Sequence, residues 1–442
     1  MFSDFSPLTS ELSEIRTTHR CGYVAAVGAG ALEIAGLASS ARVGDLVSVV
    51  ARDENTIRGE VVALARDTVR VMTYGPCDGV GLNDVARLSP FGTIRPTGAW
   101  VGRILDAFGA PLDGKPLEKG AAAVDLKAPA PQAANRKPIG GRLRSGIAAI
   151  DTMLPLARGQ RIGIFAGSGV GKSSLLAALA RGLEADIIVF ALIGERGREV
   201  RHFIDNVLGP EGMKRSVVIS ATSDQSPLVK RRSGWMAMAV AEYFRDQGKH
   251  VVLLADSITR MAESHREVAL TAGEAPSLRA FPPSTTNMIS SFAERAGPGL
   301  LGKGDITAVF SVLVAGSDME EPVADITRGV LDGHIVLDRE IAERGRFPAI
   351  DVRRSVSRSL PDAATPDENR LIDRVRKVLG TYESALPMIQ TGLYSSGSDP
   401  DIDEAIRVWP KLDAFFTRTD CTTAADAFRD LAECFGNEPK RP

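Results

Sequence analysis

The residues whose chemistry is clearest form a glycine-rich loop between two apolar runs. Its members are Ala166, Gly167, Ser168, Gly169, Val170, Gly171, Lys172, Ser173 and Ser174. The run at 161–165 predicts a buried strand, and 174–183 predicts a helix. A glycine loop in this position curls backbone N–H groups around a phosphate chain, and the helix N-terminus adds partial positive charge. We therefore predict a nucleoside triphosphate site, the alternative being a glycine-rich turn that binds nothing.

Two side chains at the end of this loop have defined roles in that chemistry. Lys172 is expected to contact the β- and γ-phosphates, and the Ser173 hydroxyl is expected to ligate Mg²⁺. The first position is Ala166, where the generic pattern has glycine. A methyl group fits there as long as the backbone keeps a negative φ.

Two carboxylates follow other apolar runs downstream of the loop. Asp256 ends the run at 251–256, the position of the acid that holds Mg²⁺ through its water shell in P-loop enzymes. The alternative is an aspartate that only caps the next helix. Glu195 ends a second run, where a carboxylate can polarise an attacking water, and Arg196 beside it can offset phosphoryl charge. The alternative for 193–198 is a solvated charged turn.

These runs belong to an alternation of strands and helices in the middle of the chain. Helices are expected at 174–183, 232–247 and 258–269, and apolar, β-rich runs lie at 161–165, 186–193, 216–220, 250–255 and 306–314. We predict a parallel sheet with helices on both faces, in which ligands bind at the carboxyl ends of the strands.

Different patterns flank this α/β region. Before it, close-spaced β-type runs predict a small antiparallel barrel; they lie at 22–27, 31–34, 45–51, 57–64 and 68–73. The segment at 121–145 is rich in Ala, Pro, Lys and Arg and predicts an extended connector. After the α/β region, residues 364–435 follow a helical pattern, for example at 367–382 and 424–434.

Composition narrows the class of protein. The chain has 442 residues and a formal net charge of −2, which gives little attraction to nucleic acid or anionic lipid. Its four cysteines lack C-x-x-C spacing, so we expect reduced thiols rather than a zinc site or disulfides; they are Cys21, Cys77, Cys421 and Cys434. We recognise no signal peptide or membrane span and therefore expect a cytoplasmic protein.

Taken in order along the chain, these motifs resemble those of the catalytic subunits of rotary ATPases. The shared segments are the glycine loop, Gly-Glu-Arg at 194–196, Leu-Leu-Ala-Asp-Ser-Ile-Thr-Arg at 253–260, Phe-Pro-Ala-Ile-Asp at 347–351 and Ser-Val-Ser-Arg at 355–358. Segments at 102–109 and 111–114 extend the resemblance over nearly the whole chain. Within that family, 166–173, 191–200, 331–338 and 397–400 resemble the export ATPases of type III secretion, those of the flagellum above all, and Ala166 is usual in that branch.

The resemblance implies a role for each residue of the predicted site. Lys172 and Ser173 bind the phosphates of ATP and the Mg²⁺ ion. Glu195 is the general base, and Asp256 is the acid that holds the metal.

Three arginines and one aromatic residue also match this family. Arg358 matches the arginine that reaches into a neighbouring subunit's site, although alone it would be taken for a surface residue. Phe347 stands where the family often has a Tyr that stacks on adenine, which a Phe can also do; a plain core aromatic is the alternative. Arg196 and Arg260 match arginines near the site.

The resemblance also implies an α/β fold with an N-terminal small β-barrel, a central RecA-like P-loop domain with a mainly parallel sheet, and a C-terminal helical domain. We place an amphipathic segment at 1–18, the barrel at 19–92, the ATPase domain with its linker (118–147) at 93–358, and the helical domain at 359–442. The implied function is Mg-dependent ATP hydrolysis by a homohexameric ring that energises export of flagellar proteins. The alternatives are the ATPase of a virulence-type injectisome, a nucleotide-binding subunit of a rotary synthase, and an RNA translocase, which the charge balance disfavours.

The implied partners are a peripheral-stalk-like flagellar regulator, a central-stalk-like export protein, the export gate and export chaperones, with peripheral contact to the membrane export apparatus and no nucleic acid. Apolar residues recur at helical spacing in the first segment, namely Phe5, Leu8, Leu12 and Ile15. This spacing predicts a short amphipathic helix, which is marginal in isolation and which we expect to bind the regulator. Folding back on the barrel is the alternative.

Overall fold

The computed structural model describes residues 18–28, 30–51, 55–90, 92–277, 280–314 and 319–436. The chain divides into two compact units. The first contains the chain up to Pro131 with Ile187–Gln247 and Ala255–Arg295, and the second contains Gln132–Asp186, Gly248–Leu254 and the chain from Ala296 onward. Across these described ranges, no helix combines the length and apolar character that crossing a bilayer requires. The predicted amphipathic segment lies outside the described residues, apart from Thr18.

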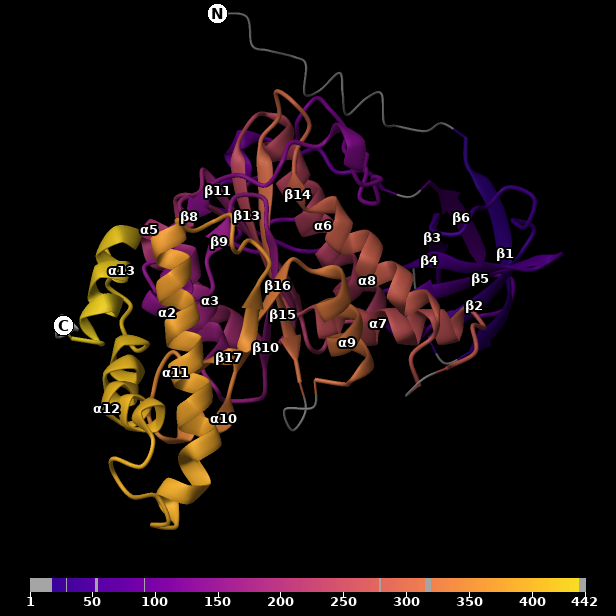
Figure 1. Ribbon diagram of the computed structural model, residues 1–442. Helices are drawn as coiled ribbons and strands as arrows, with labels where there is room; N and C mark the ends of the chain where they lie inside the picture. The colour runs from indigo at the N-terminus through magenta and orange to yellow at the C-terminus, as the bar shows by residue number, and fades with distance from the viewer. Residues whose placement is uncertain are drawn as a thin grey trace, which may run out of the picture. The chain divides into compact units, whose positions relative to one another are not determined.

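The first unit begins with a closed antiparallel barrel, drawn in indigo in Figure 1. Its strand order is β1-β2-β5-β4-β3-β6, and the strands are β1 (Arg20–Gly28), β2 (Ala31–Ala35), β3 (Leu46–Val50), β4 (Thr56–Leu64), β5 (Thr68–Thr73) and β6 (Val85–Ser89). Every second residue of β2, β3 and β6 is buried, so one face of each strand fills the barrel. The structure confirms the predicted barrel and adds β6, which the sequence analysis missed because it is short and carries an exposed arginine, Arg87.

The rest of the first unit is α/β. β11 (Ile187–Glu195) pairs in parallel with β12 (Ser216–Thr222), which pairs in parallel with β7 (Ile104–Leu105). Both long strands are buried over most of their length, which explains their continuous apolar runs. The helical elements of this unit are η1 (Gly98–Trp100), α4 (Gly197–His202), a π-helical turn (Phe203–Leu208), α5 (Gly209–Met213), α6 (Pro227–Asp246), α7 (Ile258–Thr271) and α8 (Ser284–Arg295).

The second unit holds strands in the order β17-β16-β10-β15-β13. They are β10 (Arg161–Ala166), β13 (His250–Asp256), β15 (Asp305–Leu313), β16 (Gly333–Leu337) and β17 (Ile350–Ser357). β10 pairs in parallel with β15 and β16, whereas β17 is antiparallel to β16. The strands are thus mainly parallel, as predicted. β13 begins in this unit, and its last two residues belong to the first.

Two of the longer strands of the second unit were not predicted. β16 and β17 form the antiparallel end of the strand order, and β17 carries exposed Arg353 and Arg354 among buried neighbours, which breaks its apolar run. The smaller elements of this unit are η2 (Ala133–Asn135), β8 (Arg142–Leu143), α2 (Ala148–Thr152), β9 (Leu156–Ala157), α3 (Lys172–Gly182), β14 (Gly297–Pro298), α9 (Pro322–Val330) and α10 (Arg339–Glu343).

The second unit ends in three helices, drawn in orange and yellow in Figure 1. They are α11 (Pro366–Gln390), α12 (Pro400–Phe415) and α13 (Ala424–Glu433). Side chains of Thr365, Asp399 and Thr423 accept hydrogen bonds from the first turn of each helix, which satisfies N–H groups that lack intrahelical partners. α11 and α12 lie side by side, and the rings of Tyr382 and Trp409 stack between them with centroids 4.6 Å apart. The structure confirms the predicted C-terminal helical region.

Candidate nucleotide site

β10, the glycine loop and α3 are continuous along the chain in the second unit. Ala166 is the last residue of β10, so its backbone is extended and its methyl group needs no positive φ. Gly169 and Gly171 have φ of 79° and 90°, which glycine adopts at least cost. Gly171 is the N-cap of α3, and the helix begins at Lys172, two residues before the predicted start. The first N–H groups of a helix have no carbonyl partner within it, so the first turn of α3 can donate hydrogen bonds to an anion.

A cavity of about 550 Å³ lies beside this loop. One wall is Phe347, whose Cδ1 atom would stand 3.3 Å from a Cβ placed on Gly171. The Phe347 ring is half exposed, and the peptide bond to Pro348 is cis. Residues of α3 form a second wall, and the other lining residues come from 144–147 and 417–422. The alternative of Phe347 as a plain core aromatic is wrong, because its side chain is 50% exposed.

Hydrogen bonds fix the backbone at 145–146, which lines the cavity. Asp151 is buried and accepts hydrogen bonds from the backbone N atoms of Ser145 (2.7 Å) and Gly146 (2.9 Å) and from Ser145 Oγ (2.7 Å). Burial raises the pKa of the Asp151 carboxyl, and the same hydrogen bonds act in the opposite direction. A Cβ on Gly182 would stand 1.8 Å from the Ser145 carbonyl oxygen. Only glycine therefore lets the end of α3 pack this closely against the segment.

The remaining wall comes from the chain between α12 and α13. Its backbone is tied to the segment before β10, because Cys421 N donates to Gly146 O (3.2 Å) and Ala148 N donates to Arg418 O (3.0 Å). Arg144 Nη1 donates to the carbonyl oxygen of Thr422 at 2.7 Å. Burial raises the pKa of the Cys421 thiol to about 11. This wall therefore presents a neutral thiol to the cavity.

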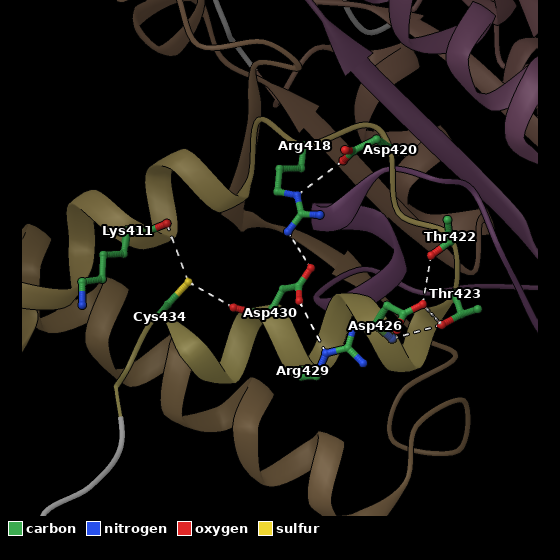
Figure 2. Close-up of polar contacts among 9 residues, drawn as sticks. All are labelled: Lys411, Arg418, Asp420, Thr422, Thr423, Asp426, Arg429, Asp430 and Cys434. Atoms are coloured by element: carbon green, nitrogen blue, oxygen red, sulfur yellow. Dashed lines mark hydrogen bonds and ion pairs between the residues drawn. The ribbon is translucent and has the colours of Figure 1, made fainter.

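Side-chain contacts brace this wall against α13 (Figure 2). Arg418 pairs with Asp430 on α13 at 2.6 Å and with Asp420 at 3.4 Å. Asp426, in the first turn of α13, accepts hydrogen bonds from Thr422 Oγ1 (2.9 Å) and Thr423 Oγ1 (2.7 Å). The sequence analysis missed this wall, because a polar connector without glycine or charge patterning does not reveal where it packs.

In the first unit, β11 ends at Glu195, directly after a glycine in the left-handed conformation. Gly194 has φ of 73°. A Cβ on Gly194 would stand 3.3 Å from Cβ of Arg260 and 3.5 Å from Cδ of Lys230, so two basic side chains pack against this backbone. The carbonyl oxygen of Glu195 accepts a hydrogen bond from Ser223 N at 3.0 Å. Arg260 was predicted to lie near the site, whereas Lys230 was missed, because nothing in the sequence of α6 distinguishes it from its basic neighbours.

Asp256 ends β13 and is 6% exposed. The helix that follows, α7, is capped by Ser257, whose Oγ accepts a hydrogen bond from Arg260 N at 3.2 Å. The N-cap of α7 is therefore Ser257 rather than Asp256. Within the described residues, no three His, Cys, Asp or Glu side chains gather as a metal site.

The two remaining arginines are exposed. Arg196 precedes α4, and its Nη1 lies 3.5 Å from Glu199 Oε1 on that helix. Arg358 directly follows β17, the last strand in its sheet order, and its backbone N donates to Asp332 O at 3.0 Å. The predicted site residues thus fall into two groups. The glycine loop, Phe347 and Arg358 belong to the second unit, and Glu195, Arg196, Asp256 and Arg260 belong to the first.

Comparison with known proteins assigns the chain to a family. Residues 146–357 match the ATP synthase alpha/beta family, nucleotide-binding domain, and residues 364–433 match the T3SS EscN ATPase C-terminal domain. The flagellum-specific ATP synthase of Caulobacter vibrioides is 43% identical over 426 residues, which cover 94% of this chain and 96% of that protein. The chain belongs to the flagellum-specific branch of the ATP synthase alpha/beta family.

Solved structures agree with this membership. The assembled ATPase EscN from the type III secretion system of enteropathogenic E. coli has a TM-score of 0.87 and 36% identity, covering 94% of this chain and all of that one. EscN in complex with its central stalk EscO has a TM-score of 0.84 and 35% identity over the same shares. Membership in this family confirms that the glycine loop belongs to a nucleotide-binding domain.

The left-handed backbone at Gly171 yields a first prediction. Gly171→Ala should weaken ADP binding by at least about tenfold, because a non-glycine residue resists this conformation by about 1–2 kcal/mol and a tenfold change corresponds to about 1.4 kcal/mol. Its methyl group would also press on Phe347. Isothermal titration with ADP measures the effect.

Gly141→Ala is the matched control, because Gly141 lies in the same unit with no neighbouring atom within 4 Å of an added Cβ. Parental ADP affinity is expected for that variant. Parental affinity in Gly171→Ala would show that the backbone of the loop does not contact the nucleotide.

Proposed function

We propose that this chain hydrolyses ATP, with Mg²⁺, at a site built around the glycine loop and that the hydrolysis drives type III export of flagellar proteins. The chain is an ATPase of the ATP synthase alpha/beta family, and its full-length similarity to a flagellum-specific ATP synthase favours the flagellar role over the injectisome. The observation that carries the proposal is the strand, glycine loop and α3 beside a cavity walled by Phe347.

Each part of the site has a role in binding the substrate. The N–H groups of the loop and of the first turn of α3 hold the phosphates, and Lys172 neutralises the β- and γ-phosphates. The adenine ring stacks on Phe347 and fills the cavity, where the wall at 417–422 contacts its edge. If the glycine-rich turn bound nothing, the cavity beside it would have no ligand to explain it.

The available oxygen donors suit Mg²⁺. This ion keeps several waters and takes one or two protein oxygens together with phosphate oxygens. The Ser173 hydroxyl would supply a protein oxygen, and the Asp256 carboxylate would hold the ion through its water shell. When bound, the ion offsets negative charge that develops on the phosphoryl oxygens.

Glu195 is the group that activates water. Its carboxylate accepts a proton as water oxygen bonds to the γ-phosphorus, the bond from that phosphorus to the β,γ-bridging oxygen breaks, and ADP and phosphate leave. Arg196 and Arg260 offset charge on the phosphoryl oxygens, and Arg260 also packs against the backbone that precedes Glu195.

Assembly completes the site. Arg358 is exposed at the end of β17, and we place its guanidinium on the γ-phosphate bound by a neighbouring copy in a homohexameric ring. EscN forms an assembled ATPase with a central stalk, and this chain is expected to engage a central-stalk-like export protein in the same way. We further propose a cytoplasmic location at the membrane export apparatus, with the flagellar regulator, export gate and export chaperones as partners.

Substitution of Lys172 and Glu195 should separate binding from chemistry. Lys172→Ala removes a positive charge from the phosphates and should weaken ATP binding. Glu195→Gln keeps the shape but loses the base, so it should bind ATP normally and turn over at least about a hundredfold more slowly. Equilibrium ATP binding and steady-state phosphate release measure the two effects.

Glu211→Gln serves as the control and should keep parental turnover, because Glu211 is exposed on α5 and pairs with Lys214, which has no role in the proposed site. If Glu195→Gln also turns over at the parental rate, Glu195 is not the base.

A mixing experiment tests the role of Arg358. Arg358→Ala and Lys172→Ala chains should each be inactive alone, and an equimolar mixture should regain part of the activity. This rescue requires an interface that pairs an intact glycine loop with an intact arginine from another chain. Activity per chain should also rise with protein concentration. A flat concentration dependence together with no rescue in the mixture would place Arg358 in its own chain's site or outside the chemistry.

A further inference from the structure

A buried ion pair links the barrel to α6 within the first unit. Glu60 lies in the middle of β4, paired on both sides in the barrel with Leu46 and Met72, and is 2% exposed. Its Oε1 accepts a hydrogen bond from Nη2 of Arg231 at 3.1 Å, and the two side chains are 3% and 8% exposed. Because the barrel is closed, Glu60 has little freedom to follow a shift of α6, and the pair therefore ties the position of the helix to that of the barrel.

Apolar packing at the same place makes this link stiff. Leu228, in the first turn of α6, packs in one buried cluster with Val62 and Met72 of the barrel and Val268 of α7. The guanidinium of Arg231 also stacks over the ring of Trp235, one turn further along α6, at 4.8 Å. Both an ion pair and apolar packing therefore fix the start of α6 against the barrel.

The other side of α6 contacts the end of β11. A Cβ on Gly234 would stand 3.3 Å from Cδ1 of Ile193 and 2.6 Å from Sδ of Met261, so the helix and the strand touch without room for a larger residue. Lys230, the residue before Arg231, packs against the left-handed Gly194. Glu195 is the next residue of the strand. A displacement of the first turns of α6 would therefore change the packing of Lys230 against Gly194, the residue before Glu195.

The charges around Glu60 explain why one carboxylate has this influence. Lys127 Nζ lies 3.8 Å from the same Oε1 and 4.0 Å from the centre of the Trp235 ring, so two cations share this one carboxylate. Neutralising Glu60 leaves Arg231 buried beside Lys127 without an opposing charge on the barrel. We expect the buried guanidinium of Arg231 to shift as a result, and the start of α6 with it.

We infer that Glu60 is a positioning residue for hydrolysis, acting through Arg231 and α6 on the Gly194–Glu195 strand end. The inference rests on the proposed role of Glu195. It assigns to the barrel an influence on the rate of the chemical step, distinct from any part that the barrel plays in assembly.

Glu60→Gln tests this inference. Its kcat should fall by at least about tenfold, because small displacements of a reacting group reduce rate steeply, whereas KM for ATP should stay within about twofold, since no group that we assign to phosphate binding contacts Glu60. Phosphate release is measured at a protein concentration where activity per chain no longer rises. Glu33→Gln is the matched control, because Glu33 pairs with Arg70 on the exposed face of the same barrel, and it should keep parental kcat.

The double variant Glu60→Gln with Arg231→Met separates positioning from stability. Removing both partners should restore most of the melting temperature lost in Glu60→Gln, because the buried Arg231 charge that lost its partner is removed as well. The kcat should stay as low as in the single variants, because the link is still broken. Recovery of kcat together with the melting temperature would overturn the inference, as would parental kcat in Glu60→Gln. If Glu60→Gln does not fold, the kcat of Arg231→Met is compared with the parental kcat instead, and the same decrease is expected. If Glu195→Gln turns over slowly while Glu60→Gln keeps the parental kcat, the role inferred for Glu60 is wrong and the proposed role of Glu195 still stands.

Discussion

The N-terminal end of α3 is the constraint on which the rest of the site depends. A helix that begins directly after a buried strand exposes N–H groups that no residue of the helix can satisfy. The left-handed backbone at Gly169 and Gly171 lets the chain turn from β10 into α3 within five residues. The same absence of a side chain at Gly171 allows Phe347 to approach. Phosphate binding and the cavity beside it thus follow from one glycine-dependent turn.

Packing around that turn gives the cavity its shape. The close approach of Gly182 to Ser145, the hydrogen bonds to Asp151 and the backbone contacts of 417–422 join α3 to the helical end of the chain. A second glycine-dependent turn, at Gly194, carries Glu195 and is wedged between Lys230 and Arg260. Both candidate chemical groups therefore follow a glycine whose left-handed backbone and close neighbours disfavour a side chain.

The sequence predicts those parts of the site whose chemistry depends on local pattern. The glycine loop, Glu195 and Asp256 are recognisable because each ends an apolar run. The wall at 417–422, Lys230 and the Ser257 cap are not, because their roles arise only when distant segments meet. In the fold, β16 and β17 escaped prediction for a related reason, since outward-facing Arg353 and Arg354 interrupt the apolar pattern of β17. The helical segment predicted at 1–18 remains a prediction, and its residues before Thr18 lie outside the described part of the chain.

The central claim is that the chain turns over ATP rather than only binding it. Phosphate release from ATP by the purified protein, compared with Mg²⁺ and with excess EDTA, tests this most directly. Sustained release over many turnovers is expected with Mg²⁺ and none above background with EDTA, because the proposed site needs the ion that Ser173 and Asp256 are suited to hold. Tight ATP binding without phosphate release under both conditions would contradict it and would indicate a regulatory nucleotide-binding subunit.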